Sequence, residues 1–248
     1  MKTVLITGSS SGFGLEIARH FLAHHWKVVA TMRKPDPALL PVSPHLSILP
    51  LDVTSEESVA GAVEAAGPID VLVNNAGIGW MNAFEGTPMD LAKELFETNT
   101  IGLMRMTQAV LPHMRENGGG VVINISSSVT LRSLPLLSVY TATKAAVNAF
   151  GASLSIELEP FGIRVRTILP GSAPTTSFGS SARAQIEAKG GFHPAYADFV
   201  SAVFASHQEN QGPKTQTSDV VEAVWRAATD KDCPAVQPAG ADAVAWAG

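Results

Sequence analysis

Short apolar runs rich in β-branched residues recur along this chain, and a helical pattern follows most of them. The runs cover residues 4–7, 27–32, 46–51, 69–73, 121–125 and 163–169, and residues 233–236 could form a seventh. Continuous apolar runs of this length are typical of strands that are buried on both faces of a parallel sheet. The alternation therefore predicts an α/β fold with a doubly wound parallel sheet of about seven strands and helices on both faces.

No internal repeat or linker divides the 248 residues, so we expect one domain over residues 1–248. Residues 35–44 are rich in proline and predict a loop where a crossover helix would otherwise stand. Residues 87–117 predict one long helix, which Asn99 interrupts because asparagine is a mediocre helix former. After Gly171 the pattern loosens, and residues 172–217 predict a flap.

The composition limits the classes of partner. The formal net charge is −5, so the chain lacks the basic surface that nucleic-acid binding needs. No apolar run approaches the ~20 residues of a membrane helix, and Gly8 interrupts the apolar start too early for a signal peptide. The single cysteine, Cys233, excludes an intrachain disulfide and fits a reducing compartment. We expect a cytoplasmic protein that binds neither nucleic acid nor membrane.

A glycine-rich turn lies between the first expected strand and the first expected helix. Its sequence is Gly8-Ser9-Ser10-Ser11-Gly12-Phe13-Gly14. Glycine lets the backbone approach a phosphate, and the helix that follows offers free N–H groups and the positive end of its dipole. The turn therefore predicts a dinucleotide site, and the alternative is an ordinary flexible turn.

The end of the second expected strand indicates which dinucleotide binds. An NAD site usually has an acidic residue there to hold the ribose hydroxyls. This chain has Arg33, which would pair with a 2′-phosphate. The sequence therefore predicts NADP(H), with NAD(H) as the alternative. Asp52 lies at the carboxyl end of the third strand, where ligands gather in an open parallel sheet.

Tyr140 and Lys144 are four residues apart and share a face if their segment is helical. A free tyrosine has a pKa of roughly 10, and a nearby ammonium lowers that pKa by favouring the phenolate. The pair can therefore form a general acid/base that works near neutral pH. The alternative is a chance surface pair on a helix.

Glu16, His20 and His24 follow one another at helical spacing and could in principle hold a metal ion. Polar residues at this spacing more often form the solvated face of a helix. We therefore predict no metal site.

Together these motifs resemble the short-chain dehydrogenase/reductase family in its single-domain form. The resemblance rests on the glycine-rich loop, on Asn74-Asn75-Ala76-Gly77 after the fourth strand, on the order of Asn99, Ser127, Tyr140 and Lys144, and on Pro170-Gly171 with Thr175 beyond. It is strong over residues 1–171 and weak over residues 172–248, where family members differ by substrate. It implies an NAD(P)-binding Rossmann-like domain in which residues 172–217 form a flap on the substrate side.

The resemblance also implies the site residues. The catalytic residues would be Asn99, Ser127, Tyr140 and Lys144. The cofactor-binding residues would be Gly8, Ser10, Ser11, Gly12, Phe13, Gly14, Arg33, Asp52, Val53, Asn75, Ala76, Gly77, Tyr140, Lys144, Pro170, Gly171 and Thr175.

The implied activity is hydride transfer between NADP(H) and a hydrophobic ketone or aldehyde, or the corresponding alcohol. Tyr140 would exchange the proton and Lys144 would lower the pKa of Tyr140. Ser127 would bond the substrate oxygen, and Asn99 would place a water that links Lys144 to solvent. Apolar residues that could line the pocket, or belong to the core, are Ile78, Trp80, Met81, Val129, Leu134, Phe178 and Phe192.

Other functions on this fold remain open at the level of sequence. One is a non-catalytic NADP(H)-binding redox sensor, and another is an enzyme for epimerisation or dehydration that returns the hydride. Since fold does not fix function, the four catalytic residues carry the preference for an oxidoreductase. By resemblance we also expect a homo-oligomer, a dimer or tetramer, through the helices that bear Asn99 and Tyr140.

Overall fold

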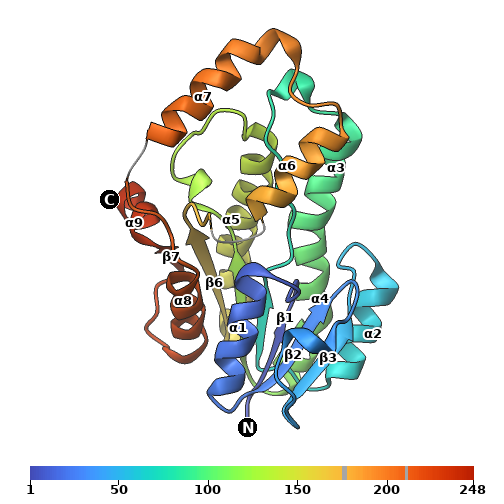
Figure 1. Ribbon diagram of the computed structural model, residues 1–248. Coiled ribbons are helices and arrows are strands. Elements are labelled where there is room, and N and C mark those ends of the chain that lie inside the picture. The colour runs from blue at the N-terminus through green and yellow to red at the C-terminus, as the bar shows by residue number, and fades with distance from the viewer. Residues whose placement is uncertain (175–177, 210–211) are drawn as a thin grey trace.

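A parallel β-sheet forms the centre of the molecule (Figure 1). The computed structural model describes residues 1–174, 178–209 and 212–248. Within these ranges seven parallel strands lie in the order β3-β2-β1-β4-β5-β6-β7. The strands are β1 (Thr3–Ile6), β2 (Lys27–Met32), β3 (Leu46–Pro50), β4 (Val71–Asn74), β5 (Gly120–Ile125), β6 (Ile163–Pro170) and β7 (Val236–Ala239). The predicted α/β class and doubly wound parallel sheet are therefore confirmed.

The helices cover both faces of this sheet and extend beyond one end of it. They are α1 (Gly12–Ala23), α2 (Glu56–Ala66), α3 (Met89–Phe96), α4 (Gly102–Glu116), α5 (Ser138–Leu158), α6 (Phe178–Ala188), α7 (Ala197–Glu209), α8 (Thr217–Thr229) and α9 (Ala241–Ala247). Short helical turns are η1 (Pro37–Leu39), η2 (Phe84–Gly86), the π-helix η3 (Glu97–Ile101), η4 (Ser128–Thr130), η5 (Glu159–Phe161) and η6 (Pro194–Tyr196).

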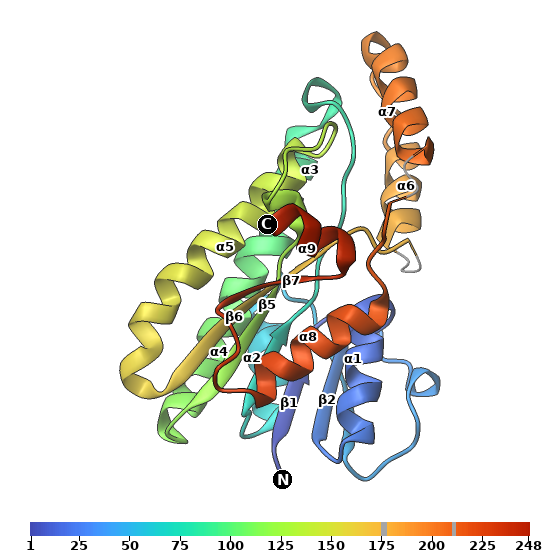
Figure 2. The same cartoon turned by 90° about the vertical axis from the view of Figure 1, so that its left-hand side faces the viewer.

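Alternate residues of the central strand β1 pack against opposite helix layers. Val4 and Ile6 of β1 join the core beneath α1 and α8, whereas Leu5 joins the core beneath α2, α4 and α5. Figure 2 shows these two layers on opposite sides of the sheet. Both faces of β1 are dry, which explains why its sequence lacks polar alternation.

The strand order reverses next to β1, since β2 lies on one side of it and β4 on the other. Connections leaving β1 and β4 therefore diverge and leave a crevice at the carboxyl ends of these strands. Figures 1 and 2 show that α6 and α7 lie beyond this same end of the sheet. The fold thus places the glycine-rich turn and the helices α6 and α7 of the predicted flap at one edge.

Local sequence sets several boundaries. Ser55 begins α2 by accepting a bond from Ser58 N at 3.2 Å, and Gly67 ends the helix with a φ of 71°. A capping box between Gln216 and Asp219 begins α8. In the proline-rich loop only the short turn η1 forms, as the sequence predicts.

Two other expectations differ from the structure. The last strand is Val236–Ala239 and not residues 233–236, because its pairing with β6, with Pro170 opposite Ala239, decides its register. Residues 239–248 support no prediction from sequence, yet they contain α9. Among the described residues, no helix combines the length and apolar character needed to cross a membrane.

Candidate functional site

Tyr140 and Ser127 meet at the carboxyl edge of the sheet. Tyr140 lies in the first turn of α5 and is 7% exposed, and Ser127 follows β5 and is 9% exposed. Their side chains form a hydrogen bond. Ser127 Oγ also accepts a bond from Val129 N at 3.3 Å, which leaves its single hydrogen to donate. The hydroxyl groups of Tyr140 and Ser127 are therefore hydrogen-bonded to each other in a buried site.

Lys144 lies one helical turn after Tyr140, with its Nζ 5.9 Å from the centroid of the tyrosine ring. The ammonium donates to Ile125 O at 2.9 Å. Burial lowers the pKa of Lys144 to about 8. The spacing predicted from sequence thus brings the two side chains to one face of α5.

Tyr140 departs from one expectation. Burial raises the pKa of Tyr140 above its ordinary value, and the hydrogen bond from Ser127 opposes this rise only in part. The predicted lowering by Lys144 is wrong for the chain by itself. The reason is that both groups are desolvated and Lys144 Nζ is directed to a backbone carbonyl. Tyr140 is therefore protonated at neutral pH.

Asn99 lies in the π-helix η3, between α3 and α4, so the predicted interruption of the long helix is real. Its Oδ1 accepts from Ile78 N at 2.8 Å, and its Nδ2 donates to Ile78 O at 2.9 Å and to Thr143 Oγ1 at 3.2 Å. A Cβ added at Gly77 would lie 3.1 Å from Asn99 Oδ1 and 3.7 Å from Lys144 Nζ. Asn99 and Lys144 therefore converge on Gly77.

The turn between β1 and α1 is shaped as an anion site requires. Gly8 and Gly12 have φ values of 70° and 56°, which side-chain-bearing residues rarely adopt. A Cβ added at Gly14 would collide with Gly8 O and Asn75 Nδ2. The first turn of α1 has no acidic residue in its sequence, so nothing there neutralises the positive end of the helix dipole.

The loop after β4 is fastened to this turn. Asn75 Nδ2 donates to Thr7 O at 2.9 Å and Gly8 O at 3.0 Å, and Asn75 N and Ala76 N both donate to Thr7 Oγ1 at 2.9 Å. The structure therefore brings Gly8–Gly14 and residues 75–77 together as predicted. The same bonds give Thr7, the last residue of the first apolar run, a structural role at the site.

The predicted cofactor residues Arg33, Asp52 and Val53 lie at the end of β2 and after β3. Arg33 is exposed, and Asp52 lies close enough that the Arg33 charge helps to lower the Asp52 pKa. The larger cause is a pair of bonds to Asp52 Oδ1 from Thr54 Oγ1 at 2.7 Å and Thr54 N at 2.9 Å. The Asp52 carboxylate thus holds the turn into α2, and its contact with a cofactor stays a prediction. Val53 is buried beside it and its carbonyl accepts from Arg105 at 2.6 Å.

These motifs agree with the comparisons. A family model described as short chain dehydrogenase matches residues 2–186. The chain belongs to the short-chain dehydrogenase family. Its members are oxidoreductases, which agrees with the Tyr140, Lys144 and Ser127 geometry.

Three similar proteins place this short-chain dehydrogenase among its relatives. The uncharacterized oxidoreductase YusZ of Bacillus subtilis is 37% identical over 239 residues, which cover 92% of this chain and 85% of the relative. A short-chain dehydrogenase from Streptomyces avermitilis has a TM-score of 0.82 and 36% identity, with 99% of this chain and 90% of the other covered. A short chain dehydrogenase from Burkholderia cenocepacia, solved in complex with NADP, has a TM-score of 0.79 and 26% identity, with 100% and 93% covered.

The dehydrogenase has an apolar cluster next to Val139, the neighbour of Tyr140. Trp80, Leu91, Leu95, Val139 and Ile186 are buried there, and Ile78, Met81 and Phe192 pack against them. The predicted pocket residues Ile78, Trp80, Met81 and Phe192 are therefore brought together, on core and flap elements alike. Val129 lies in η4, Leu134 is half-buried in the loop before α5, and the side chain of Phe178 is not described.

The motif Pro170-Gly171 lies at the end of β6 and in the residue after it. Gly171 N donates to Ala239 O at 3.2 Å, which fixes the motif against β7. Thr175, the last predicted cofactor residue, lies outside the described residues.

A hollow of about 1190 Å³ lies between α1 and α8, apart from the site around Tyr140. Glu16, His20, Glu222 and Arg226 line it, and Tyr140 and Lys144 do not. The rings of His20 and His24 stack with centroids 4.2 Å apart. In the ranges that the structure describes, no three His, Cys, Asp or Glu side chains gather as a metal site would require.

Proposed function

We propose that this chain is an NADP(H)-dependent oxidoreductase that interconverts a hydrophobic ketone or aldehyde with the corresponding alcohol. The observation that carries the proposal is the buried hydrogen bond between Tyr140 and Ser127, with Lys144 one helical turn away. Catalysis of hydride transfer needs a proton donor beside the developing alkoxide, and this arrangement supplies one.

Tyr140 acts as the acid in reduction and as the base in oxidation. Because burial raises its pKa, the free enzyme holds Tyr140 protonated and ready to donate at neutral pH. Ser127 directs its hydroxyl hydrogen to the same place, where it stabilises charge on the substrate oxygen. Lys144, still largely charged at pH 7 with a pKa of about 8, lies one helical turn away with its Nζ held by Ile125 O.

The residues fit a dinucleotide phosphate at the carboxyl edge. Gly8–Gly14 offer N–H groups and the α1 dipole to the pyrophosphate, and residues 75–77 close the other side of the crevice. Arg33 is exposed at the end of β2, where a guanidinium can pair with a 2′-phosphate. The bound nicotinamide supplies or accepts the hydride. The Burkholderia cenocepacia relative in complex with NADP supports this preference.

The substrate side is apolar. Trp80, Met81, Phe192 and Ile186 form one cluster beside Val139, the neighbour of Tyr140. Such a lining favours a carbonyl compound with a hydrophobic body, because burying apolar surface is the main source of affinity there.

We further propose a homo-oligomer, a dimer or tetramer, through the surfaces of the π-helix region and α5. Ile101 is 41% exposed and Ile156 is 72% exposed on these elements. Exposed branched side chains on neighbouring helices favour burial against a second copy.

The test follows the absorbance of reduced nicotinamide with a panel of ketones, aldehydes and quinones, using NADPH and NADH in parallel. We expect faster oxidation of NADPH. Tyr140→Phe should abolish turnover while NADPH binding persists, since the ring keeps its packing and loses only the hydroxyl. Substantial residual turnover in this variant would refute the assignment of Tyr140.

Arg33→Asp tests the cofactor preference separately. The variant should weaken NADPH far more than NADH, because a carboxylate repels the 2′-phosphate. Equal weakening of both cofactors would count against a contact between Arg33 and that phosphate. Lys34→Asp, one residue further along the same exposed loop, makes the same charge change and serves as the control.

A further inference from the structure

The C-terminal helix α9 joins the two ends of the flap. Asp242 in its first turn is 7% exposed and Ala243 is fully buried. Asp242 Oδ2 accepts from Ser172 N at 2.7 Å, and Asp242 Oδ1 accepts from Thr215 Oγ1 at 2.6 Å. Ser172 begins the flap and Thr215 lies near its end. One carboxylate therefore binds both the segment that enters the flap and the segment that leaves it.

The two ends are also bonded directly to each other. Thr215 N donates to Ser172 O at 2.9 Å, and the Thr215 side chain is fully buried. Among the residues that the structure describes, no lysine or arginine forms an ion pair with Asp242. A buried carboxylate without a cation depends on hydrogen bonds for its stability, so these two donors are essential to it.

Two glycines make this close approach feasible. A Cβ added at Gly171 would collide with the Asp242 carboxylate, and a Cβ added at Gly240 would collide with Thr215 Oγ1. Gly240 also has a φ of 101°, which turns the chain from β7 into α9. Pro170-Gly171, the motif at the end of β6, is thus held directly against Asp242.

We propose that Asp242 is a positioning residue for the reaction: it clamps the base of the flap and thereby fixes the flap wall of the substrate pocket. The wall residues Ile186 and Phe192 belong to the flap and pack on Trp80, so a loosened base moves them relative to Tyr140. The effect on the reaction rests on the proposed function, whereas the hydrogen bonds that form the clamp do not depend on it.

The variants are chosen as pairs. Asp242→Ala and Thr215→Val remove the clamp, whereas Asp242→Asn and Thr215→Ser keep it. The amide oxygen of the Asp242→Asn variant accepts from Ser172 N, and its NH₂ group donates to Thr215 Oγ1. The Thr215 hydroxyl then donates to Ala239 O, which already lies 3.1 Å away. Valine is nearly isosteric with threonine, so Thr215→Val still tests the clamp if the Asp242→Ala variant does not fold.

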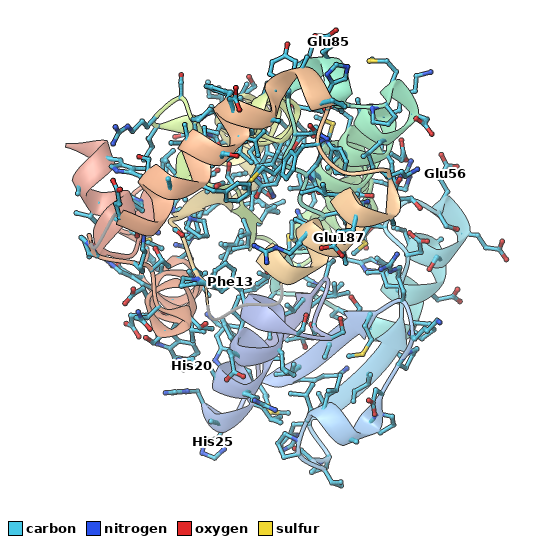
Figure 3. All side chains as sticks on the ribbon, turned by 45° about the horizontal axis from the view of Figure 1, so that its top comes forward. Phe13, His20, His25, Glu56, Glu85 and Glu187 are labelled. Carbon is cyan, nitrogen blue, oxygen red and sulfur yellow. The ribbon has the colours of Figure 1, made fainter. Side chains whose placement is uncertain are left out.

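The first readout is cleavage by trypsin at Arg183 and Lys189, which are exposed on and just after α6. Figure 3 labels Glu187, which lies between these two residues on the same segment. Both clamp-removing variants should be cleaved about tenfold faster than wild type, because cleavage follows local opening. The conservative variants should stay within about threefold of wild type. Arg132→Ala is the control, because it removes the contact of Arg132 with the Trp246 ring of α9, 5.7 Å away, and leaves the clamp intact.

The second readout is kinetic. In the clamp-removing variants the KM for the carbonyl substrate should rise about tenfold, since misplaced pocket walls weaken binding and alignment. NADPH affinity should fall by less than the affinity for the carbonyl substrate, because the pyrophosphate loop belongs to β1 and α1 and the clamp touches the predicted cofactor residues at Gly171. Wild-type cleavage rates in both clamp-removing variants, or equal acceleration in the conservative variants, would overturn the clamp. The protease readout needs no turnover, so it remains decisive if wild type oxidises no NADPH and the proposed function fails.

Discussion

The substitution Lys144→Met tests whether the buried charge of Lys144 lowers the free energy of unfolding. Lys144 is 5% exposed, and its pKa falls from 10.5 to about 8 through burial. This fall corresponds to about 3 kcal/mol against folding at neutral pH, at about 1.4 kcal/mol for each pH unit. Methionine has a similar length and no charge, so the variant escapes this cost.

The lost hydrogen bond opposes that gain. Lys144 Nζ donates to Ile125 O at 2.9 Å, and leaving that bond unmade costs about 1–2 kcal/mol. The variant should therefore be more stable than wild type by about 1–2 kcal/mol at pH 7. For a chain of this size the gain raises Tm by about 2–8 °C.

The difference in stability between the variant and wild type should change with pH. Below pH 8 Lys144 is charged in both the folded and the unfolded state, so the folded wild type carries the full cost. Between pH 8 and 10.5 the folded state releases the proton and the unfolded state keeps it, so the cost disappears as the pH rises. The variant should thus lose its advantage across this window and become less stable than wild type near pH 10.5.

The assay is thermal unfolding of the cofactor-free proteins by circular dichroism at pH 7 and pH 10. Other groups titrate equally in both proteins, so the difference between them isolates Lys144. Lys93→Met, at an exposed position of α3, is the matched control and should show no such reversal. A Lys144→Met variant that is less stable than wild type by the same amount at both pH values would refute the reasoning.

Three further substitutions test separate parts of the site. Gly14→Ala should destabilise the protein by about 1–3 kcal/mol and weaken NADPH binding in a fluorescence titration, because its Cβ meets Gly8 O, a backbone atom that cannot move aside. Gly61→Ala, with open space among the described atoms around its Cβ in α2, should instead stabilise the protein by about 0.5–1 kcal/mol in urea unfolding; a loss there would contradict the geometry. Ser127→Ala should lower kcat by roughly 10²–10³-fold with NADPH affinity unchanged, and a kcat within a few-fold of wild type would exclude Ser127 from stabilising the substrate oxygen.

Much of the fold was predictable because it depends on local patterns. Continuous apolar runs determine strands buried on both faces, and β2 begins and ends at the residues predicted for it. The turn before α1, the interruption at Asn99 and the shared face of Tyr140 and Lys144 follow from residue type and spacing. These features need only a few neighbouring residues to be specified.

The tertiary structure alone decided what depends on distant partners and on burial. The last strand takes its register from β6, so its own short sequence could not place it. The direction of the Tyr140 pKa depends on desolvation by surrounding elements, which no i, i+4 spacing contains. Asp242 meets Ser172 across 70 residues, and Gly171 leaves the space that the carboxylate fills. Sequence determined which groups are the candidates for the chemistry, and packing decided their protonation and what holds them in place, since solvent exclusion and long-range contacts exist only in the folded chain.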